Sequence, residues 1–366
     1  MWLIIFAVVM AALIAGIAYL TVAACRFGLI QKASGGKKWL GILISLGVIV
    51  ILFTAAALVM DFTNAVIVLV FTFLFFLLFG IIGFAAEKIS GKSSKINWPG
   101  WLALLSTIIY FSAGYYLCNN VWQTDYDLKT DKSVGRLKIA MFADSHIGAT
   151  FDGKGFAAEL KKINRQHPDI VLVPGDYVDD WSNKEDMKTA SAALGKMKAK
   201  YGVWFSYGNH DEGMFNDRNF TAAELESELE KNGVHVLADS YELVDDRFYV
   251  VCRKDSSVSP DRMSMDDLLK GIDTEKYVIV LDHEPNDYDN EAASDADLVL
   301  SGHTHGGQLF PFNKAGEWFN INDRTYGYER RKGTDFIVTS GISDWAILFK
   351  TGTKSEYVII DLEGKN

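Results

Sequence analysis

The chain has 366 residues, more than a single domain usually needs, with 36 Lys and Arg, 46 Asp and Glu, and a formal net charge of −10. Its charge is unevenly divided: residues 1–118 hold seven basic and two acidic side chains, and residues 119–366 hold 29 and 44. An acidic C-terminal part excludes nucleic acid as a partner, because phosphate-backbone binding needs a basic face. Three cysteines are too few for a disulfide framework.

The first 118 residues contain four stretches without any charged residue, each long enough to cross the ~30 Å hydrocarbon core of a bilayer as a helix. These stretches are residues 2–24, 39–60, 65–86 and 98–118. The first lacks the basic start of a signal peptide and is too long for one, so we expect it to be retained. The pattern predicts an all-α region of four membrane spans over residues 1–118.

The loops between the predicted spans set their orientation. Four basic residues lie between the first two spans, and three lysines with one glutamate lie between the third and fourth. The link between the second and third carries only Asp61. By the positive-inside rule both basic loops are cytoplasmic. We therefore expect an integral protein of the cell membrane whose residues after Cys118 lie on the extracytoplasmic side.

Residues 119–135 are polar and acidic, and they predict a juxtamembrane linker. From residue 136, apolar runs alternate with amphipathic stretches, which favours one α/β domain over residues 136–366. The predicted helices cover residues 155–166, 185–200, 222–232 and 264–271. The predicted strands cover residues 137–142, 170–173, 203–206, 277–281, 297–300, 336–340 and 356–361.

Five short motifs each follow one of these strands and contain five of the seven histidines. They are Asp144-Ser145-His146, Gly175-Asp176, Gly208-Asn209-His210-Asp211, His283 and Gly302-His303-Thr304-His305. Strand ends are where open α/β sheets bind ligands. Two divalent ions about 3.5–4 Å apart need a bridging carboxylate with oxygen and nitrogen ligands, which the motifs offer without a thiolate. Singly these aspartates are typical turn residues, but together the motifs predict a two-metal phosphoesterase site; His167 and His235 are predicted to be structural.

The ordered motifs resemble those of the calcineurin-like metallophosphoesterase superfamily over about residues 140–362. The string Ser301-Gly302-His303-Thr304-His305-Gly306-Gly307-Gln308, followed by Pro311, is similar to one branch of it. That branch contains bacterial membrane-associated phosphodiesterases of the YaeI/YkuE type and animal transmembrane proteins with a metallophosphoesterase domain. The resemblance implies a four-layer α/β/β/α sandwich and two divalent ions, with manganese favoured over iron, zinc or cobalt.

The resemblance also implies a role for each motif residue. The implied ligands are Asp144, His146 and His305 for the first ion, Asp176 for both, and Asn209, His283 and His303 for the second. His210 would face the substrate phosphate and assist the leaving group, with Asp211 orienting it. Asp179 fits a distal acid beside the ligands, whereas Asp180 and Asp282 are expected to be turn acids that face solvent.

The predicted activity is hydrolysis of a phosphoester or pyrophosphate at the membrane surface, by attack of a metal-bridging hydroxide. Four spans favour a lipid-linked substrate and membrane lipid as a partner. A broad phosphodiesterase for soluble phosphodiesters or nucleotides is the alternative, and a non-catalytic receptor or scaffold on the same fold is a third. The complete ligand set and His210 argue against the scaffold. The pattern does not indicate an oligomeric state.

Three further features are expected near the substrate. Gln308 is expected either to cap the chain or to bind the substrate with Asn209 and His210. Residues 324–332 are expected to form a loop that returns over the metals, where Arg330 and Arg331 grip an anionic headgroup, or a plain solvated loop. Apolar residues after two motifs are expected to form either a rim for lipid or domain core: Met214, Phe215, Phe220, Phe310, Phe312, Trp318 and Phe319.

Overall fold

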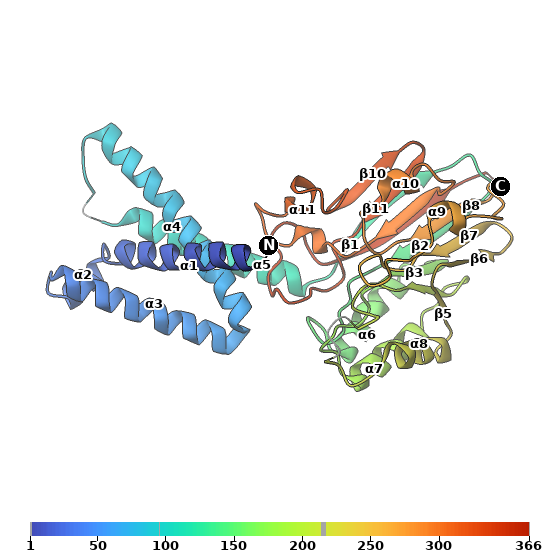
Figure 1. Ribbon diagram of the computed structural model, residues 1–366, viewed down its shortest axis with the longest axis horizontal. Helices are drawn as coiled ribbons and strands as arrows, with labels where there is room; N and C mark the ends of the chain where they lie inside the picture. The colour runs from blue at the N-terminus through green and yellow to red at the C-terminus, as the bar shows by residue number, and fades with distance from the viewer. Residues whose placement is uncertain (1, 95, 214–216, 366) are drawn as a thin grey trace. The chain divides into compact units, whose positions relative to one another are not determined.

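The structure is a computed structural model that describes residues 2–94, 96–213 and 217–365, with side chains described from residue 13 onward. It divides into two compact units, Met1–Gly114 and Tyr115–Asn366. Figure 1 shows that the first unit is helical and that the second contains the sheets. Met214 and Phe215, expected as part of an apolar rim, lie outside the described residues.

The first unit is built from apolar helices. They are α1 (Trp2–Ala24), α2 (Gly28–Ala33), α3 (Lys38–Met60), α4 (Phe62–Ser90) and α5 (Trp98–Asn119), the last of which continues into the second unit. Within the described residues, α3, α4 and α5 are long and apolar enough to cross a membrane, and α1 contributes the shorter apolar stretch Leu13–Ala24. Three candidate spans are thus present, and the fourth stays a prediction.

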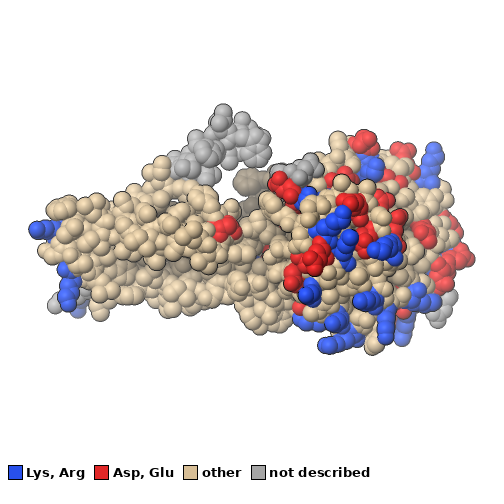
Figure 2. All heavy atoms as spheres, turned by 90° about the horizontal axis from the view of Figure 1, so that it is seen from below, with Lys and Arg blue, Asp and Glu red and all other residues tan. Residues whose placement is uncertain are grey.

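Large apolar side chains cover the outside of these helices. Leu58, Val59 and Ile89 are among the most exposed, while a small core forms around Leu20 and Phe76. In Figure 2 charged side chains are scarce over the helices and frequent over the second unit. An apolar exterior with intrahelical backbone bonding suits a lipid solvent, because the bilayer core offers backbone groups no partner.

The second unit contains two six-stranded mixed sheets. In spatial order the first holds β1 (Trp122–Lys129), β12 (Glu356–Glu363), β2 (Arg136–Met141), β3 (Ile170–Pro174), β4 (Val203–Ser206) and β5 (Val234–Leu237). The second holds β10 (Gly327–Arg331), β11 (Thr334–Val338), β9 (Leu298–Ser301), β8 (Tyr277–Leu281), β7 (Phe248–Cys252) and β6 (Ser240–Val244). The runs β2–β3–β4–β5 and β7–β8–β9–β11 are parallel, so within each sheet their carboxyl ends share one edge.

Alternate residues of the central strands enter different cores. In β3, Ile170 and Leu172 enter the core that also contains Ile279 of β8, whereas Val171 and Val173 enter the core shared with helices. Both faces of these central strands are buried, which is why they read as continuous apolar runs. The helices are α6 (Gly153–Asn164), α7 (Lys184–Leu194) and α8 (Ala222–Lys231) beside the first sheet, and α9 (Met265–Leu268) and α10 (Tyr288–Glu291) beside the second.

Residues 234–252, for which no strand was predicted, hold β5, β6 and β7, and the predicted linker also holds a strand. Residues 119–135, expected to be a linker, contain strand β1, which pairs in parallel with β12 from Trp122 opposite Glu356 to Lys129 opposite Glu363. β1 is an edge strand whose residues are mostly exposed or half-buried. Polar and charged residues suit such an edge, so the apolar pattern that reveals central strands is absent from it.

Candidate metal centre

Every predicted ligand lies just beyond the carboxyl end of a strand. Asp144 and His146 follow β2, Asp176 follows β3, Asn209 follows β4, His283 follows β8, and His303 and His305 follow β9. All are buried except His303, which is partly exposed. The two parallel runs thus bring residues more than 150 positions apart in sequence to one place.

The ligand atoms gather in two adjacent groups. Donor atoms of Asp144, His146 and His305 lie within 4.8 Å of one another, as do those of Asp176, His283 and His303. Oδ2 of Asp176 lies 3.1 Å from Nε2 of His283 and 3.6 Å from Nε2 of His146, so this carboxylate stands between the groups. Oδ1 of Asn209 lies 3.2 Å from Nδ1 of His303 in the second group.

Several donor atoms in these groups are buried without a hydrogen bond to any residue that the structure describes. They are both ring nitrogens of His146, Nε2 of His283, Nδ1 of His305 and Oδ2 of Asp144. A buried polar atom without a hydrogen bond costs about 1–3 kcal/mol. So many of these atoms in one place therefore indicate a site that binds an ion. Imidazole nitrogens and carboxylate oxygens that face one another without hydrogen-bond geometry fit divalent cations such as manganese, iron, zinc or cobalt.

The backbone is strained at the same residues. Asp144, His146, Asp176, His303 and His305 have φ values of 54°, 37°, 51°, 68° and 49°. The left-handed region is uncommon for residues other than glycine and costs about 1–3 kcal/mol at each position. Strain of this kind persists where function requires it, and here it lets Asp144 and His146, two positions apart, direct their side chains into one group.

Two glycines leave the space that the groups need. A Cβ atom on Gly175, whose φ is +83°, would lie 2.6 Å from the backbone nitrogen of Gly208 and 2.7 Å from Nδ1 of His283. On Gly302 a Cβ atom would lie 2.9 Å from both carboxylate oxygens of Asp144. Because nothing larger than hydrogen fits at either position, the glycines of these motifs are part of the site's geometry.

Hydrogen bonds and charges prepare the ligand atoms. Nδ1 of His283 donates to the carbonyl oxygen of Pro174 at 2.8 Å, which holds the ring in place and turns Nε2 toward Asp176. Burial, and then the charge of His283, lower the pKa of His303 and favour the neutral imidazole that binds metals. Burial alone would raise the pKa of Asp176, but His283 and His146 hold that pKa well below its usual range.

The partner of His210 differs from the prediction. Nδ1 of His210 lies 2.6 Å from Oδ2 of Asp180, a fully buried residue that was expected to face solvent. Asp211 was expected to orient His210, yet its carboxylate accepts from the backbone N–H groups of Tyr177, Val178 and Gly208 at 2.9, 3.1 and 2.9 Å. Asp211 therefore ties two motif loops together, and Asp180 orients the imidazole.

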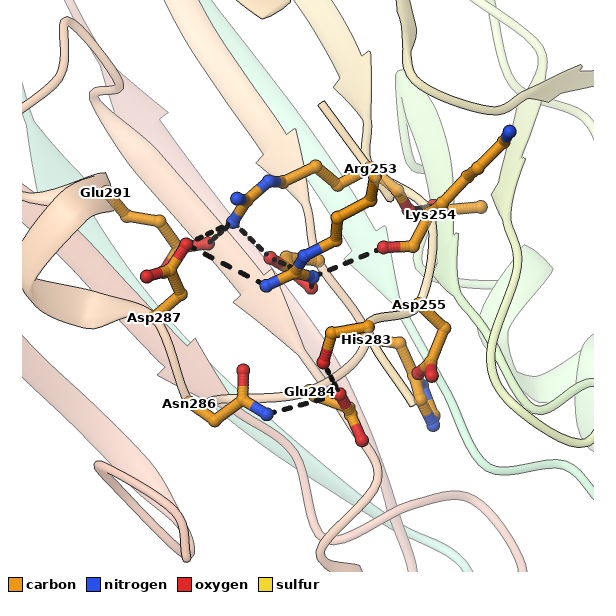
Figure 3. A network of polar contacts seen from close by, with 12 residues as sticks. Arg253, Lys254, Asp255, His283, Glu284, Asn286, Asp287 and Glu291 are labelled. Atoms are coloured by element: carbon orange, nitrogen blue, oxygen red, sulfur yellow. Dashed lines mark hydrogen bonds and ion pairs between the residues drawn. The ribbon is translucent and has the colours of Figure 1, made fainter. Parts of the chain in front are cut away.

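A buried ionic network lies beside His283 in the chain. Asp282, also expected to face solvent, is fully buried, and its carboxylate pairs with Arg253 at 2.8 Å and Arg262 at 2.9 Å. Figure 3 shows this network, in which Arg253 also reaches Asp287 and Glu291. It fixes the loop between β8 and α10 that carries His283. No sequence pattern identifies these two arginines, because buried and exposed arginines look alike in a sequence.

Another fixed cluster surrounds His305. Nε2 of Gln308 donates to Oδ1 of Asp344 at 2.8 Å, and the same oxygen lies 3.2 Å from Nδ1 of His305 and from Nζ of the fully buried Lys350. Gln308 therefore lies near the first group with its amide nitrogen engaged by the protein. The sequence analysis missed Asp344 and Lys350, which follow β11 and carry no motif.

The arginines expected over the metals lie elsewhere. Residues 327–331 form β10, and its antiparallel register sets Gly327 opposite Val338, at the metal-site end of β11, and Arg331 opposite Thr334, at the other end. Arg330 pairs with both carboxylate oxygens of Asp335 at 2.8 and 2.9 Å. The expected loop over the metal site is therefore wrong, because a strand's rise of about 3.3 Å per residue carries both arginines away from it.

The fold and this cluster define the class of a metallohydrolase built on mixed α/β sheets. The family model of the calcineurin-like phosphoesterases matches residues 137–307. An uncharacterized metallophosphoesterase of Campylobacter jejuni is 30% identical over 277 residues, which cover 72% of this chain and 69% of that protein. The chain belongs to the calcineurin-like phosphoesterase family and is a metal-dependent phosphoester hydrolase.

Two further relatives come from the branch of the family that the sequence motifs resemble. A transmembrane protein with metallophosphoesterase domain from Bos taurus is 27% identical over 243 residues, 63% of this chain and 54% of that protein. The uncharacterized metallophosphoesterase YkuE of Bacillus subtilis is 28% identical over 181 residues, 48% of this chain and 60% of that protein. The resemblance to transmembrane metallophosphoesterase-domain proteins and to YkuE is confirmed.

Proposed function

We propose that this chain is a membrane-anchored phosphohydrolase that uses two divalent ions, manganese foremost, to cleave a phosphoester or pyrophosphate bond. Asp144, His146 and His305 would hold one ion, Asn209, His283 and His303 the other, and Asp176 both. The observation that carries the proposal is the pair of adjacent donor groups, rich in buried nitrogens without hydrogen bonds, on either side of the Asp176 carboxylate.

When bound, the ions would lower the pKa of an attacking water and neutralise charge on the phosphoryl oxygens. The chain's own residues then orient the reaction. Asp180 accepts from Nδ1 of His210 and stabilises the protonated ring, so Nε2 can give a proton to the leaving oxygen. The β8–α10 loop, fixed by Asp282, and the cluster around Asp344 keep His283 and His305 from moving as charge develops.

The substrate in this proposal is presented by the membrane. The apolar helices support a lipid-linked phosphoester or pyrophosphate over a soluble one, and the basic loops support a catalytic unit on the extracytoplasmic side. Four spans, a four-layer α/β/β/α catalytic domain over residues 136–366 and a single active site per chain belong to the same proposal. The separate cores on both outer faces and between the sheets support the layering.

The test uses the full chain purified in detergent and loaded with Mn²⁺. Turnover is measured on a chromogenic phosphodiester, on a pyrophosphate linked to a diacyl lipid, and on the same headgroup without acyl chains. We expect hydrolysis of all three, with a higher kcat/KM for the lipid-linked compound. Equal values for the two matched headgroups would remove the lipid preference. A folded chain that hydrolyses none of them with manganese, iron, zinc or cobalt would contradict the hydrolase itself.

A further inference from the structure

The segment that follows the His305 motif exposes large apolar side chains. Trp318, Phe319 and Ile321 are 61%, 74% and 65% exposed, and Phe310 and Phe312 are exposed as well. The intervening helix α11 (Ala315–Trp318) has no buried residue. For Phe310, Phe312, Trp318 and Phe319 the expectation of domain core is therefore wrong, whereas Phe220, from the same set, is buried in the core beside the first sheet. A group of exposed aromatic side chains of this size marks an interaction surface.

The segment is held in place at its base. The backbone N–H groups of Thr351 and Gly352 donate to the carbonyl oxygen of Gln308 at 2.8 and 3.0 Å, and the N–H of Phe310 donates to Oγ1 of Thr351 at 3.1 Å. On its other side, the N–H of Thr325 donates to Oε1 of Glu317 at 2.9 Å. The exposed side chains are thus presented by an ordered projection of the second unit.

The same base is bonded to the end of a candidate membrane span. Ser355, four residues after Thr351, donates from its N–H to the carbonyl oxygen of Leu117 at 3.0 Å and from Oγ to that of Cys118 at 2.7 Å. Leu117 and Cys118 form the last turns of α5, within the second unit. Four residues span at most about 14 Å, so the base of the projection lies near the end of α5 that belongs to the second unit.

Residues around that point have the composition of a membrane interface. Tyr115, Tyr116 and Trp122 are exposed, as aromatic residues are at the headgroup level of a bilayer. Residues 309–322 carry only two charged side chains, Lys314 and Glu317, of opposite sign and 3.8 Å apart. Residues 309–322 therefore have no net charge that would oppose their insertion into a membrane interface.

We propose that Trp318, Phe319 and Ile321 insert into the interfacial layer of the bilayer that α5 spans, as a second membrane contact of the catalytic unit. Trp and Phe are suited to this layer, because their rings are largely apolar and tolerate a wet boundary. His305 and Gln308 precede the projection directly, so the contact would hold the mouth of the metal centre at the lipid headgroups. The contact itself does not depend on what the centre hydrolyses.

The test places a nitroxide label on Phe319→Cys in the full chain, reconstituted in phosphatidylcholine–phosphatidylglycerol vesicles. The matched control is Asp131→Cys, whose native side chain is 98% exposed beyond the far end of β1. Accessibility to oxygen, which partitions into lipid, and to a water-soluble nickel chelate is measured by electron paramagnetic resonance. The unsubstituted chain, treated with the same reagent, gives the background from Cys25, Cys118 and Cys252.

We expect the label at 319 to show several-fold higher oxygen and lower nickel accessibility than the label at 131. Equal nickel accessibility at both positions would overturn the proposal. Loss of accessibility to both reagents at 319, dependent on the protein-to-lipid ratio, would also overturn it in favour of contact between two copies. Because neither readout needs turnover, failure of the membrane contact is distinguishable from failure of the proposed hydrolase.

Discussion

At the scale of single residues, His210 separates catalysis from metal binding. Its ring pairs with Asp180 through Nδ1, and it also forms, with His146 and Asp179, a third group of donor atoms within 4.8 Å of one another, which the two proposed ions do not use. His210→Ala should therefore lower kcat by about 10²–10⁴-fold, the usual loss when a general acid is removed, with metal content unchanged. Metal analysis and steady-state kinetics on the same preparation check this. Loss of a full metal equivalent would identify His210 as a ligand instead.

Asp180 and Asp211 are both buried but have different partners, so one variant should mainly lose activity and the other should mainly lose stability. Asp180→Asn should lower kcat and leave the melting temperature nearly unchanged, because the amide retains the shape but cannot stabilise the charged ring of His210. Asp211→Asn should lower the stability by about 1–3 kcal/mol, because one of its acceptor oxygens becomes a donor facing backbone N–H groups. Thermal unfolding and kcat, measured side by side, distinguish the two. The reverse pattern would restore Asp211 as the residue that orients His210.

At the scale of elements, the buried network beside His283 connects a loop to the metals. Asp282→Asn should cost about 3–5 kcal/mol, because it removes the buried carboxylate with which both Arg253 and Arg262 pair, and should loosen the ion held by His283 first. The matched control is Glu363→Gln, which breaks an exposed pair with Arg136 and should change little. Thermal unfolding and metal content check the pair of variants. Equal melting temperatures would show that the network does not support the loop.

Elements were predictable from the sequence where burial gives them a pattern. The strands that precede the ligands are buried on both faces, and each ends in a motif, so both the strands and the positions of the ligands could be inferred. The edge strands β1, β5, β6 and β10 were not predicted, because edge strands tolerate polar residues and then resemble a linker or a loop; β7 was missed as well, although it is buried. The roles of Asp180, which pairs with His210, and of Asp282, which pairs with two buried arginines, were also missed, since a buried acid beside a motif resembles a turn residue.

At the scale of the whole molecule, the basic loops predict the side of the membrane that the catalytic unit occupies. A cysteine at Asp131 should react with a membrane-impermeant maleimide on intact cells, whereas a cysteine at Lys92 should react only after permeabilisation. Both native side chains are exposed, so reactivity reports topology and not burial. Labelling in the opposite order would place the catalytic unit in the cytoplasm.

The most direct test of the two-metal centre is the metal content of the full chain beside that of Asp176→Ala. Asp176 is the carboxylate between the two donor groups, so its removal should affect both ions at once. Elemental analysis of the chain loaded with Mn²⁺ should give two ions per chain, and the folded variant should hold fewer ions and lack turnover. One ion or none in the parent chain, or parent-like turnover by a variant without metal, would contradict the account.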